Sequence, residues 1–485
     1  MTYILYINFT TMNNINFEKQ IDDIKSWILN NKNEETSTNL YKKINALHST
    51  VHCVEKLKKR KTQNAKNINK KQRIDNDIQD LEILEKIDVD INKNRNPFCY
   101  VCKTLKKNLN EGIKQMSGAD EALFHFKCHD CIKFNTLKRN ICADLRGKTS
   151  IVTGARVKIG FEIAIKLLSS GSVVIATTRF PMDALNRFSN HVDFESFRDR
   201  LIVYPLDLRY KNDMDDFISY IYKTYEKIDI LINNACQTIQ RPKNFYEHLI
   251  SNEKTIAKLI ENCESVSKDN IHENNIIIPY NNTIKNVNTY IDKIMNPLGE
   301  GDCKLFPHGK YDENSEQIDL RTTNTWVQEI GDIDIRECAN LFSINTLAPF
   351  HLIQSFIPIM TNKNIKSDNN GSYIINVSSM EGVFNTRKTT KHPQTNMAKS
   401  AMNMITRSCS RTLAKKQIYM SSVDTGWVTN EHPYGYKSKV HLHNDKPLLD
   451  NIDGACRVLD PVFKYYNTGV FTNGMFLKDY VVSKW

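Results

Sequence analysis

The chain has 485 residues, 40% of them hydrophobic and 25% charged, which is enough for one large globular domain with smaller additions. Its formal net charge of +11 is spread over this length and distinguishes poorly among phosphate, nucleic-acid and membrane partners. No run approaches the roughly 20 apolar residues of a membrane-spanning helix, and the twelve cysteines do not form a disulfide framework, so we expect a cytoplasmic protein without membrane association.

Residues 1–95 are predicted to form a polar, largely helical extension. Phe17, Ile21, Ile24 and Ile28 recur on one helical face, which is typical of a docking helix. The run 56–73 carries nine Lys or Arg residues and no acidic residue. We interpret this run as a solvated linker, and contact with RNA is the less favoured alternative.

A cysteine-rich module is predicted over residues 96–145. Cys99 and Cys102 form one CxxC pair, Cys128 and Cys131 form a second, and 25 residues (103–127) lie between the two pairs. Each CxxC pair forms a tight turn, called a knuckle, whose two thiolates point the same way. Two knuckles complete a tetrahedral site for Zn²⁺. Because four sulfurs fill the coordination shell, we predict that the ion is structural and not catalytic. The alternative is four ordinary buried cysteines.

Residues 146–485 alternate apolar, β-branched runs with helical stretches. This alternation predicts an α/β fold, a doubly wound parallel sheet of the Rossmann-like type. The pattern breaks at about 239–322, which we interpret as a partly disordered insertion at the carboxyl end of the sheet. The expected strands are 149–154, 172–178, 201–207, 228–235, 371–379 and 418–426.

A glycine-containing loop at residues 153–160 joins the first strand to a helix, where backbone N–H groups and the helix dipole can hold a pyrophosphate. Asp207 ends the third strand, and Asn233 ends the fourth. With these motifs in this order, the region 148–435, apart from the insertion, resembles the short-chain dehydrogenase/reductase family. Lys158 stands where that family's loop has its middle glycine.

The resemblance implies a nicotinamide dinucleotide cofactor, and charge indicates which one. Arg179 follows the second strand, where a carboxylate would select NAD(H). A guanidinium suits a 2′-phosphate, and Arg156 points the same way, so NADP(H) is preferred over NAD(H). The alternative is that Arg179 caps a surface turn. The predicted cofactor-binding residues are Gly154, Arg156, Lys158, Ile159, Gly160, Arg179, Asp207, Asn233 and Lys399.

The resemblance also implies four catalytic positions, which this chain fills with Asn345, Ser379, Thr395 and Lys399. The family has tyrosine as its proton donor at the position of Thr395. An aliphatic hydroxyl is a far weaker acid than a phenol, whose pKa is about 10. His392, or Lys399 acting through Thr395 or a water, is an alternative donor.

Three other residues near the expected site have structural interpretations. Tyr373 is expected to face the core, and Cys236 to fill space as a small residue. The turn at Asp424–Trp427 corresponds to the family's Pro-Gly turn near the cofactor carboxamide.

Three functions remain open at this point. The leading hypothesis is an NADP(H)-dependent oxidoreductase that acts on an unknown small-molecule carbonyl or alcohol with a non-standard proton donor. The second is a catalytically impaired NADP(H)-binding protein that serves as a sensor or scaffold. In the third, the zinc module and the basic run 56–73 contact RNA or a protein. A homo-oligomer is a further possible partner arrangement.

Overall fold

The computed structural model describes residues 99–103, 127–250, 253–254, 270–273, 276–279, 287–295, 299, 301–361, 371–434 and 447–485. All of them belong to one compact unit, Asn96–Trp485. The predicted polar extension 1–95, with its basic run 56–73, lies outside the described residues, as does the middle of the cysteine module, 104–126.

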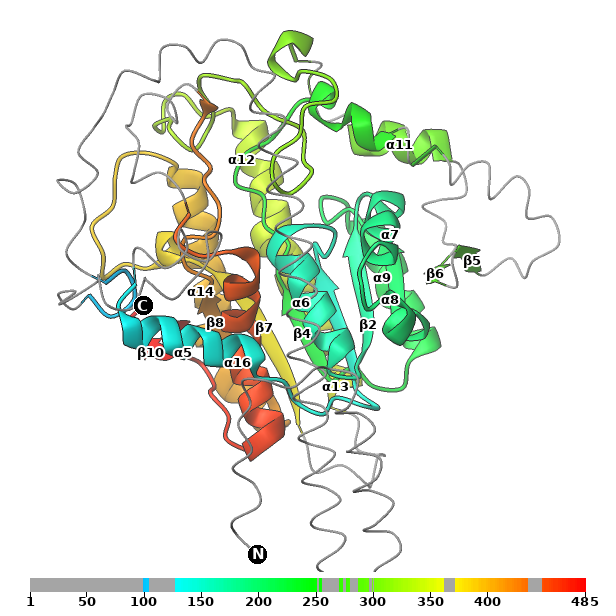
Figure 1. The fold of residues 1–485 in the computed structure, drawn as a ribbon, viewed down its shortest axis with the longest axis vertical. Helices are drawn as coiled ribbons and strands as arrows, with labels where there is room; N and C mark the ends of the chain where they lie inside the picture. Colours follow the sequence, from blue (N-terminus) through cyan, green and yellow to red (C-terminus); the bar gives the residue numbers. More distant parts are fainter. Residues whose placement is uncertain are drawn as a thin grey trace, which may run out of the picture. The chain divides into compact units, whose positions relative to one another are not determined.

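Ten strands in the described part of the chain form a single sheet, in the order β10-β9-β8-β7-β4-β1-β2-β3-β6-β5 (Figure 1). The central strands β8, β7, β4, β1, β2 and β3 are all parallel, whereas the outermost strands β10 and β5 are antiparallel to their neighbours. This order confirms the predicted doubly wound sheet. The strands are β1 Thr149–Thr153, β2 Val173–Thr178, β3 Leu201–Pro205, β4 Ile230–Asn233, β5 Asn270–Glu273, β6 Ile276–Pro279, β7 Ser372–Ser378, β8 Ile418–Asp424, β9 Phe476–Lys478 and β10 Val481–Ser483.

Helices cover both faces of the sheet, as a mostly parallel sheet requires. The α-helices are α5 His129–Asn140, α6 Lys158–Ser169, α7 Pro181–Ser189, α8 Phe194–Phe197, α9 Lys211–Thr224, α11 Val287–Met295, α12 Ile335–Phe342, α13 Ala348–Met360, α14 Pro393–Ala414 and α16 Asn451–Thr468. A π-helical turn, η5 Ser343–Leu347, joins α12 to α13, and short 3-10 turns lie at η2 Arg198–Arg200, η3 Lys243–Tyr246, η4 Cys303–Leu305 and η6 Met380–Gly382.

Two hydrophobic cores form because successive residues of a strand point to opposite faces. Val152 of β1 packs in the core that contains residues of α6, α7 and α16. Its neighbour Ile151 packs in the opposite core, with residues of α9 and α13. Both side chains are fully buried, so the sheet is anchored from both sides.

The insertion contributes a β-hairpin that the sequence analysis did not foresee. β5 and β6 pair with each other, and β6 pairs with the outer edge of β3. Two strands of four residues are too short to show a period that a sequence pattern could reveal. After the hairpin, residues 301–329 approach the carboxyl end of the sheet, where Asp312, Glu316 and Trp326 line a cavity.

Candidate functional site

A cavity of about 680 Å³ lies at the carboxyl ends of the central strands. In open α/β sheets this is where ligands bind, and the volume falls in the usual range for a ligand pocket. Most of the predicted site residues line it, namely Gly154, Arg156, Lys158, Ile159, Gly160, Arg179, Asp207, Ser379, Thr395 and Lys399. Asn233 and Asn345 do not.

The loop between β1 and α6 is closely packed against the end of β4. Gly154 has a φ of +68°, and a Cβ there would lie 2.8 Å from the Cα of Ala235. A Cβ on Gly160 would lie 2.2 Å from the Gly154 carbonyl oxygen. Asn234 fixes this packing, since its Nδ2 donates to the carbonyl oxygens of Thr153 and Gly154 at 3.0 and 3.2 Å. Glycine is therefore required at both positions.

Lys158 keeps the backbone conformation that glycine favours. Its φ is +55°, in the left-handed region that few non-glycine residues adopt. The loop thus retains its path and gains a cationic side chain at the cavity.

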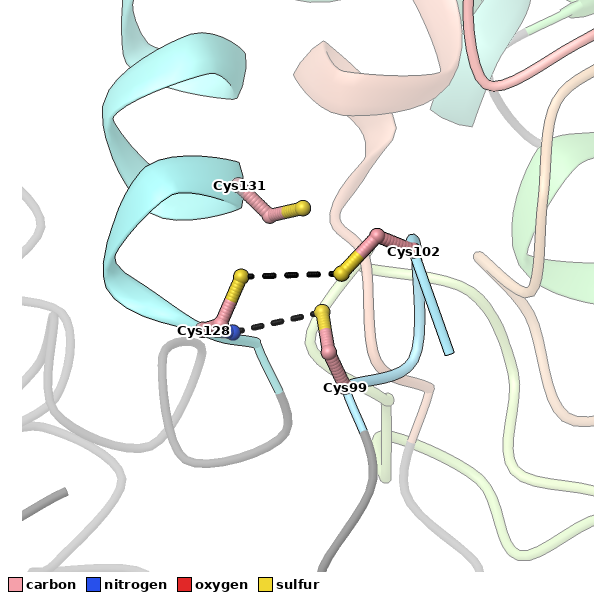
Figure 2. A group of neighbouring side chains, drawn as sticks. All are labelled: Cys99, Cys102, Cys128 and Cys131. Carbon is pink, nitrogen blue, oxygen red and sulfur yellow. Dashed lines mark hydrogen bonds between the residues drawn. The ribbon is translucent and has the colours of Figure 1, made fainter. Parts of the chain in front are cut away.

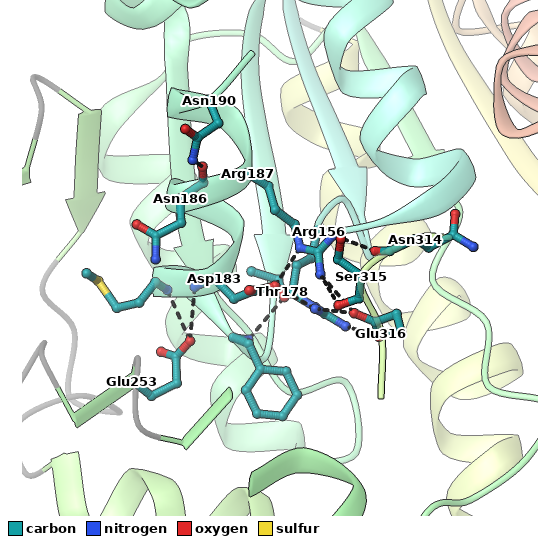
Figure 3. A network of polar contacts seen from close by, with 12 residues as sticks. Arg156, Thr178, Asp183, Asn186, Arg187, Asn190, Glu253, Asn314, Ser315 and Glu316 are labelled. Carbon is teal, nitrogen blue, oxygen red and sulfur yellow. Dashed lines mark hydrogen bonds and ion pairs between the residues drawn. The ribbon is translucent and has the colours of Figure 1, made fainter. Parts of the chain in front are cut away.

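Arg156 is part of a buried cluster of four charged side chains (Figure 3). Its guanidinium donates to Asp183 at 2.6 Å and to both carboxylate oxygens of Glu316 at 2.8 and 2.6 Å. Arg187 donates to the same two acids, at 2.7 and 3.0 Å. Burial tends to raise the pKa of Asp183 and Glu316, but the two arginines outweigh it and hold each pKa below its ordinary value.

In this arrangement the Nη1 and Nη2 atoms of Arg156 are engaged by carboxylates, so its predicted role at a 2′-phosphate would require these ion pairs to rearrange. The role of Glu316 could not be predicted from the sequence, because the residue belongs to the insertion and no motif surrounds it. Arg179 lies at the end of β2 and lines the cavity. Its guanidinium stacks on the rings of Phe180 and Tyr246, 5.5 and 5.4 Å from their centroids.

Asp207 and Asn233 have partners within the protein. The Asp207 carboxylate is buried and forms a two-pronged ion pair with Arg209. Burial would raise the pKa of Asp207, but this pairing lowers it overall. The Asn233 amide donates to Asn376 at 2.8 Å behind the cavity wall. Its neighbour Asn234 faces the cavity instead, which the sequence analysis did not anticipate.

Thr395 and Lys399 lie one turn apart on α14 and both line the cavity. Lys399 Nζ donates to the Val377 carbonyl oxygen at 2.8 Å, which fixes its ammonium beside the end of β7. Thr395 is 1% exposed, and its hydroxyl has no hydrogen-bond partner among the described residues. A buried hydroxyl without a protein partner is uncommon and indicates a group that a ligand can satisfy.

Ser379 follows β7 and completes this wall of the cavity. Asn345 lies in the π-helical turn η5, a feature that often occurs at functional sites. Its amide accepts from the Gln237 backbone N–H at 2.9 Å and donates to the Gln237 carbonyl oxygen at 2.8 Å. Asn345 therefore holds the loop after β4, behind the cavity.

The alternative proton donor His392 and the nearby Tyr373 both lie outside the cavity lining. His392 stacks on the Trp326 ring at 4.2 Å and forms a hydrogen bond with the Trp326 carbonyl oxygen, so it does not reach the cavity lining. Tyr373 is fully buried, and its hydroxyl donates to the Thr472 carbonyl oxygen. Tyr373 is thus a core residue, as expected. Cys236 lines the cavity, and so does Tyr100, which sequence analysis did not single out.

The four cysteines of the two CxxC pairs meet in space (Figure 2). Their sulfur atoms all lie within 4.8 Å of one another, and the Cys102 and Cys128 sulfurs are 3.7 Å apart. Zn–S bonds of 2.3 Å in a tetrahedron place sulfurs about 3.8 Å apart. The cluster has the donor set and spacing of a four-thiolate metal site.

The sequence profile of the short chain dehydrogenase family matches residues 148–263 and 312–435. This part of the chain belongs to the short-chain dehydrogenase family. The matched segments contain the loop 153–160, Ser379, Thr395 and Lys399, all of which line the cavity. In the described residues, no helix has the length and apolar character needed to cross a membrane.

Several known proteins are similar in sequence or in fold to parts of this chain. An uncharacterized protein of Acanthamoeba polyphaga mimivirus is 27% identical over 382 residues, which cover 75% of this chain and 71% of the viral protein. Retinol dehydrogenase 13 of Mus musculus is 34% identical over 93 residues, which cover 19% of this chain and 28% of that enzyme. Among solved structures, NADPH-bound carbonyl reductase from chicken fatty liver has 17% identity and a TM-score of 0.44, covering 72% of this chain and 98% of its own.

Proposed function

We propose that this dehydrogenase domain is an NADP(H)-dependent oxidoreductase that acts on a carbonyl or alcohol substrate with a non-standard proton donor. The observation that carries the proposal is one cavity that joins the glycine loop of β1 to Ser379, Thr395 and Lys399. A site that had lost all redox function would have no reason to keep these groups together.

The cavity wall offers groups suited to the two phosphate-bearing parts of a dinucleotide, the diphosphate and the 2′-phosphate. The loop 153–160 and the first turn of α6 would hold the diphosphate, and Lys158 would add a positive charge there. Arg179, supported on two aromatic rings, would bind the 2′-phosphate. When bound, the nicotinamide gives or accepts the hydride.

Proton transfer would then involve Thr395 and Lys399. The Thr395 hydroxyl, which has no partner among the residues that the structure describes, would donate a hydrogen bond to the substrate oxygen. Ser379 would polarise the same oxygen. The Lys399 ammonium would supply the proton through Thr395 or a water, because a threonine hydroxyl is too weak an acid to give up its own proton readily.

We also propose that Cys99, Cys102, Cys128 and Cys131 bind a structural Zn²⁺ as thiolates. Cys99 also accepts a hydrogen bond from the Cys128 backbone N–H at 3.2 Å, which joins the two knuckles. N–H donors to sulfur favour the thiolate form that a metal needs.

The function is tested by titrating NADPH into the purified protein and then following cofactor absorbance with a panel of carbonyl substrates. Lys399→Ala should abolish turnover, whereas Lys415→Ala, at the exposed end of α14, should leave it unchanged. Tight NADPH binding without turnover on any carbonyl would favour the alternative, an impaired NADP(H)-binding sensor or scaffold. Absence of NADPH binding would contradict both functions.

A further inference from the structure

Tyr100 connects the cysteine cluster to the dehydrogenase cavity. It lies in the first CxxC pair, directly after Cys99, and its side chain lines the cavity. Its hydroxyl oxygen accepts a hydrogen bond of 3.0 Å from the Trp427 backbone N–H. A residue carried by the metal-binding knuckle therefore contacts the wall of the cofactor pocket directly.

The turn that Tyr100 contacts follows β8 and lines the same cavity. Gly426 has a φ of +77°, and its N–H donates to the Asp424 carboxylate at 2.9 Å. Asp424 also pairs with Lys478 at 2.8 Å. The Gly426 amide is therefore hydrogen-bonded within the turn, whereas the Trp427 amide is hydrogen-bonded to Tyr100 of the cysteine module.

The second CxxC pair is attached to the same domain by buried charges. Lys127, next to Cys128, pairs with Asp453 of α16 at 3.1 Å, and both side chains are almost fully buried. Arg139, at the end of α5, pairs with Asp453 at 2.8 Å. Arg457 of α16 donates to Asn135 of α5 at 2.9 Å. Because α5 is docked in this way, a metal that joined the four sulfurs would tie the first knuckle to an anchored second one.

We propose that Tyr100 is a positioning residue of the cofactor pocket, and that through it metal binding at the four cysteines sets the affinity for the dinucleotide. The metal holds the first knuckle, the knuckle places the Tyr100 hydroxyl, and the hydroxyl holds the Trp427 amide and the cavity-lining turn. This inference rests on the proposed cofactor function and the proposed metal site.

The contact itself is tested without cofactor, by hydrogen exchange of the full-length protein measured by mass spectrometry with single-residue fragmentation. The Trp427 amide should be protected in the zinc-loaded protein and exchange faster after chelation or in Tyr100→Phe. The Gly426 amide, bonded within the turn, is the internal control and should not change. Equal protection of Trp427 in all three samples would overturn the proposal.

The consequence for the cofactor is tested by NADPH titrations of zinc-loaded variants whose metal content is verified. Tyr100→Phe should bind roughly three- to tenfold more weakly, the effect of one hydrogen bond. Lys103→Ala is the matched control, because its ammonium lies 4.7 Å from the Tyr100 ring centroid but does not line the cavity. Unchanged affinity in Tyr100→Phe, or an equal loss in Lys103→Ala, would contradict the positioning role.

Chelation separates this inference from the proposed function. In the wild type, zinc removal should weaken NADPH binding, and in Tyr100→Phe it should cause little further loss. An equal loss in both proteins would show that the metal acts by another route and would overturn the proposal. If the wild type shows the zinc-dependent protection of Trp427 but binds no NADPH, the proposed cofactor function fails while the contact between knuckle and turn stands.

Discussion

Replacing Arg156 with methionine removes the central cation from the charge cluster beside the cavity. The Arg156 side chain is 9% exposed, and methionine keeps much of its apolar length. The substitution leaves Asp183 and Glu316 with Arg187 as their cation within the cluster. Two largely buried carboxylates would then share one guanidinium.

We expect this variant to lose about 3–5 kcal/mol of unfolding free energy, the usual cost of removing one partner from a buried ion pair. The double variant Arg156→Met with Glu316→Gln should recover part of that loss, because Arg187 and Asp183 then balance each other. Urea unfolding at neutral pH, followed by circular dichroism, measures both as shifts of the midpoint. Arg146→Met, at an exposed arginine, is the control and should not shift it.

One result would contradict a structural role for Arg156. If Arg156→Met unfolds at the wild-type midpoint but binds NADPH ten times more weakly, the arginine is a phosphate ligand. Asp183 and Glu316, shown in Figure 3, would then be partners of Arg156 that the cofactor phosphate displaces.

Four further outcomes are expected. The pKa values of Asp183 and Glu316 are lowered in the folded protein, so their ion pairs stabilise the fold fully above pH about 4.5. This stabilisation is lost as the pH falls below that value and the carboxylates are protonated. The urea midpoint should therefore drop less in acid for Glu316→Gln, which has one of these carboxylates fewer. Arg179→Ala should weaken NADPH binding by roughly ten- to hundredfold and leave NADH binding unchanged, as titrations with both cofactors would reveal. Cys102→Ser should release zinc to a chelator that the wild type resists, as a colorimetric zinc assay would measure. Thr395→Tyr should raise turnover by about a hundredfold or more if the proton donor limits the rate, and an unchanged rate would mean that another step limits it.

The sheet and most of the cavity could be predicted from the sequence, because they depend on local patterns. Runs such as TSIVT and SYIINVS are apolar and β-branched, and both formed buried parallel strands. Gly154 and Lys399 could be placed by their spacing within motifs. Gly154 lines the cavity because it directly follows β1, at the carboxyl ends of the parallel strands, whereas Lys399 reaches the cavity from α14.

Contacts between distant segments could not be predicted. One partner of Arg156 is Glu316, 160 residues further on, and nothing local to either residue indicates the pair. Asn345 matched its expected helix, yet its amide is bound to Gln237, more than a hundred residues earlier. Nothing near Tyr100 in the sequence indicates its contact with the Trp427 amide, since that turn lies far along the chain.

The β5–β6 hairpin lies at one edge of the sheet, outside the six central parallel strands. β6 pairs outside β3, whereas β4, which precedes it in the chain, pairs with β1 on the other side. The six central parallel strands therefore pair with one another without any contribution from the hairpin. Changes in the length or sequence of the hairpin should therefore leave the pairing of the central strands intact.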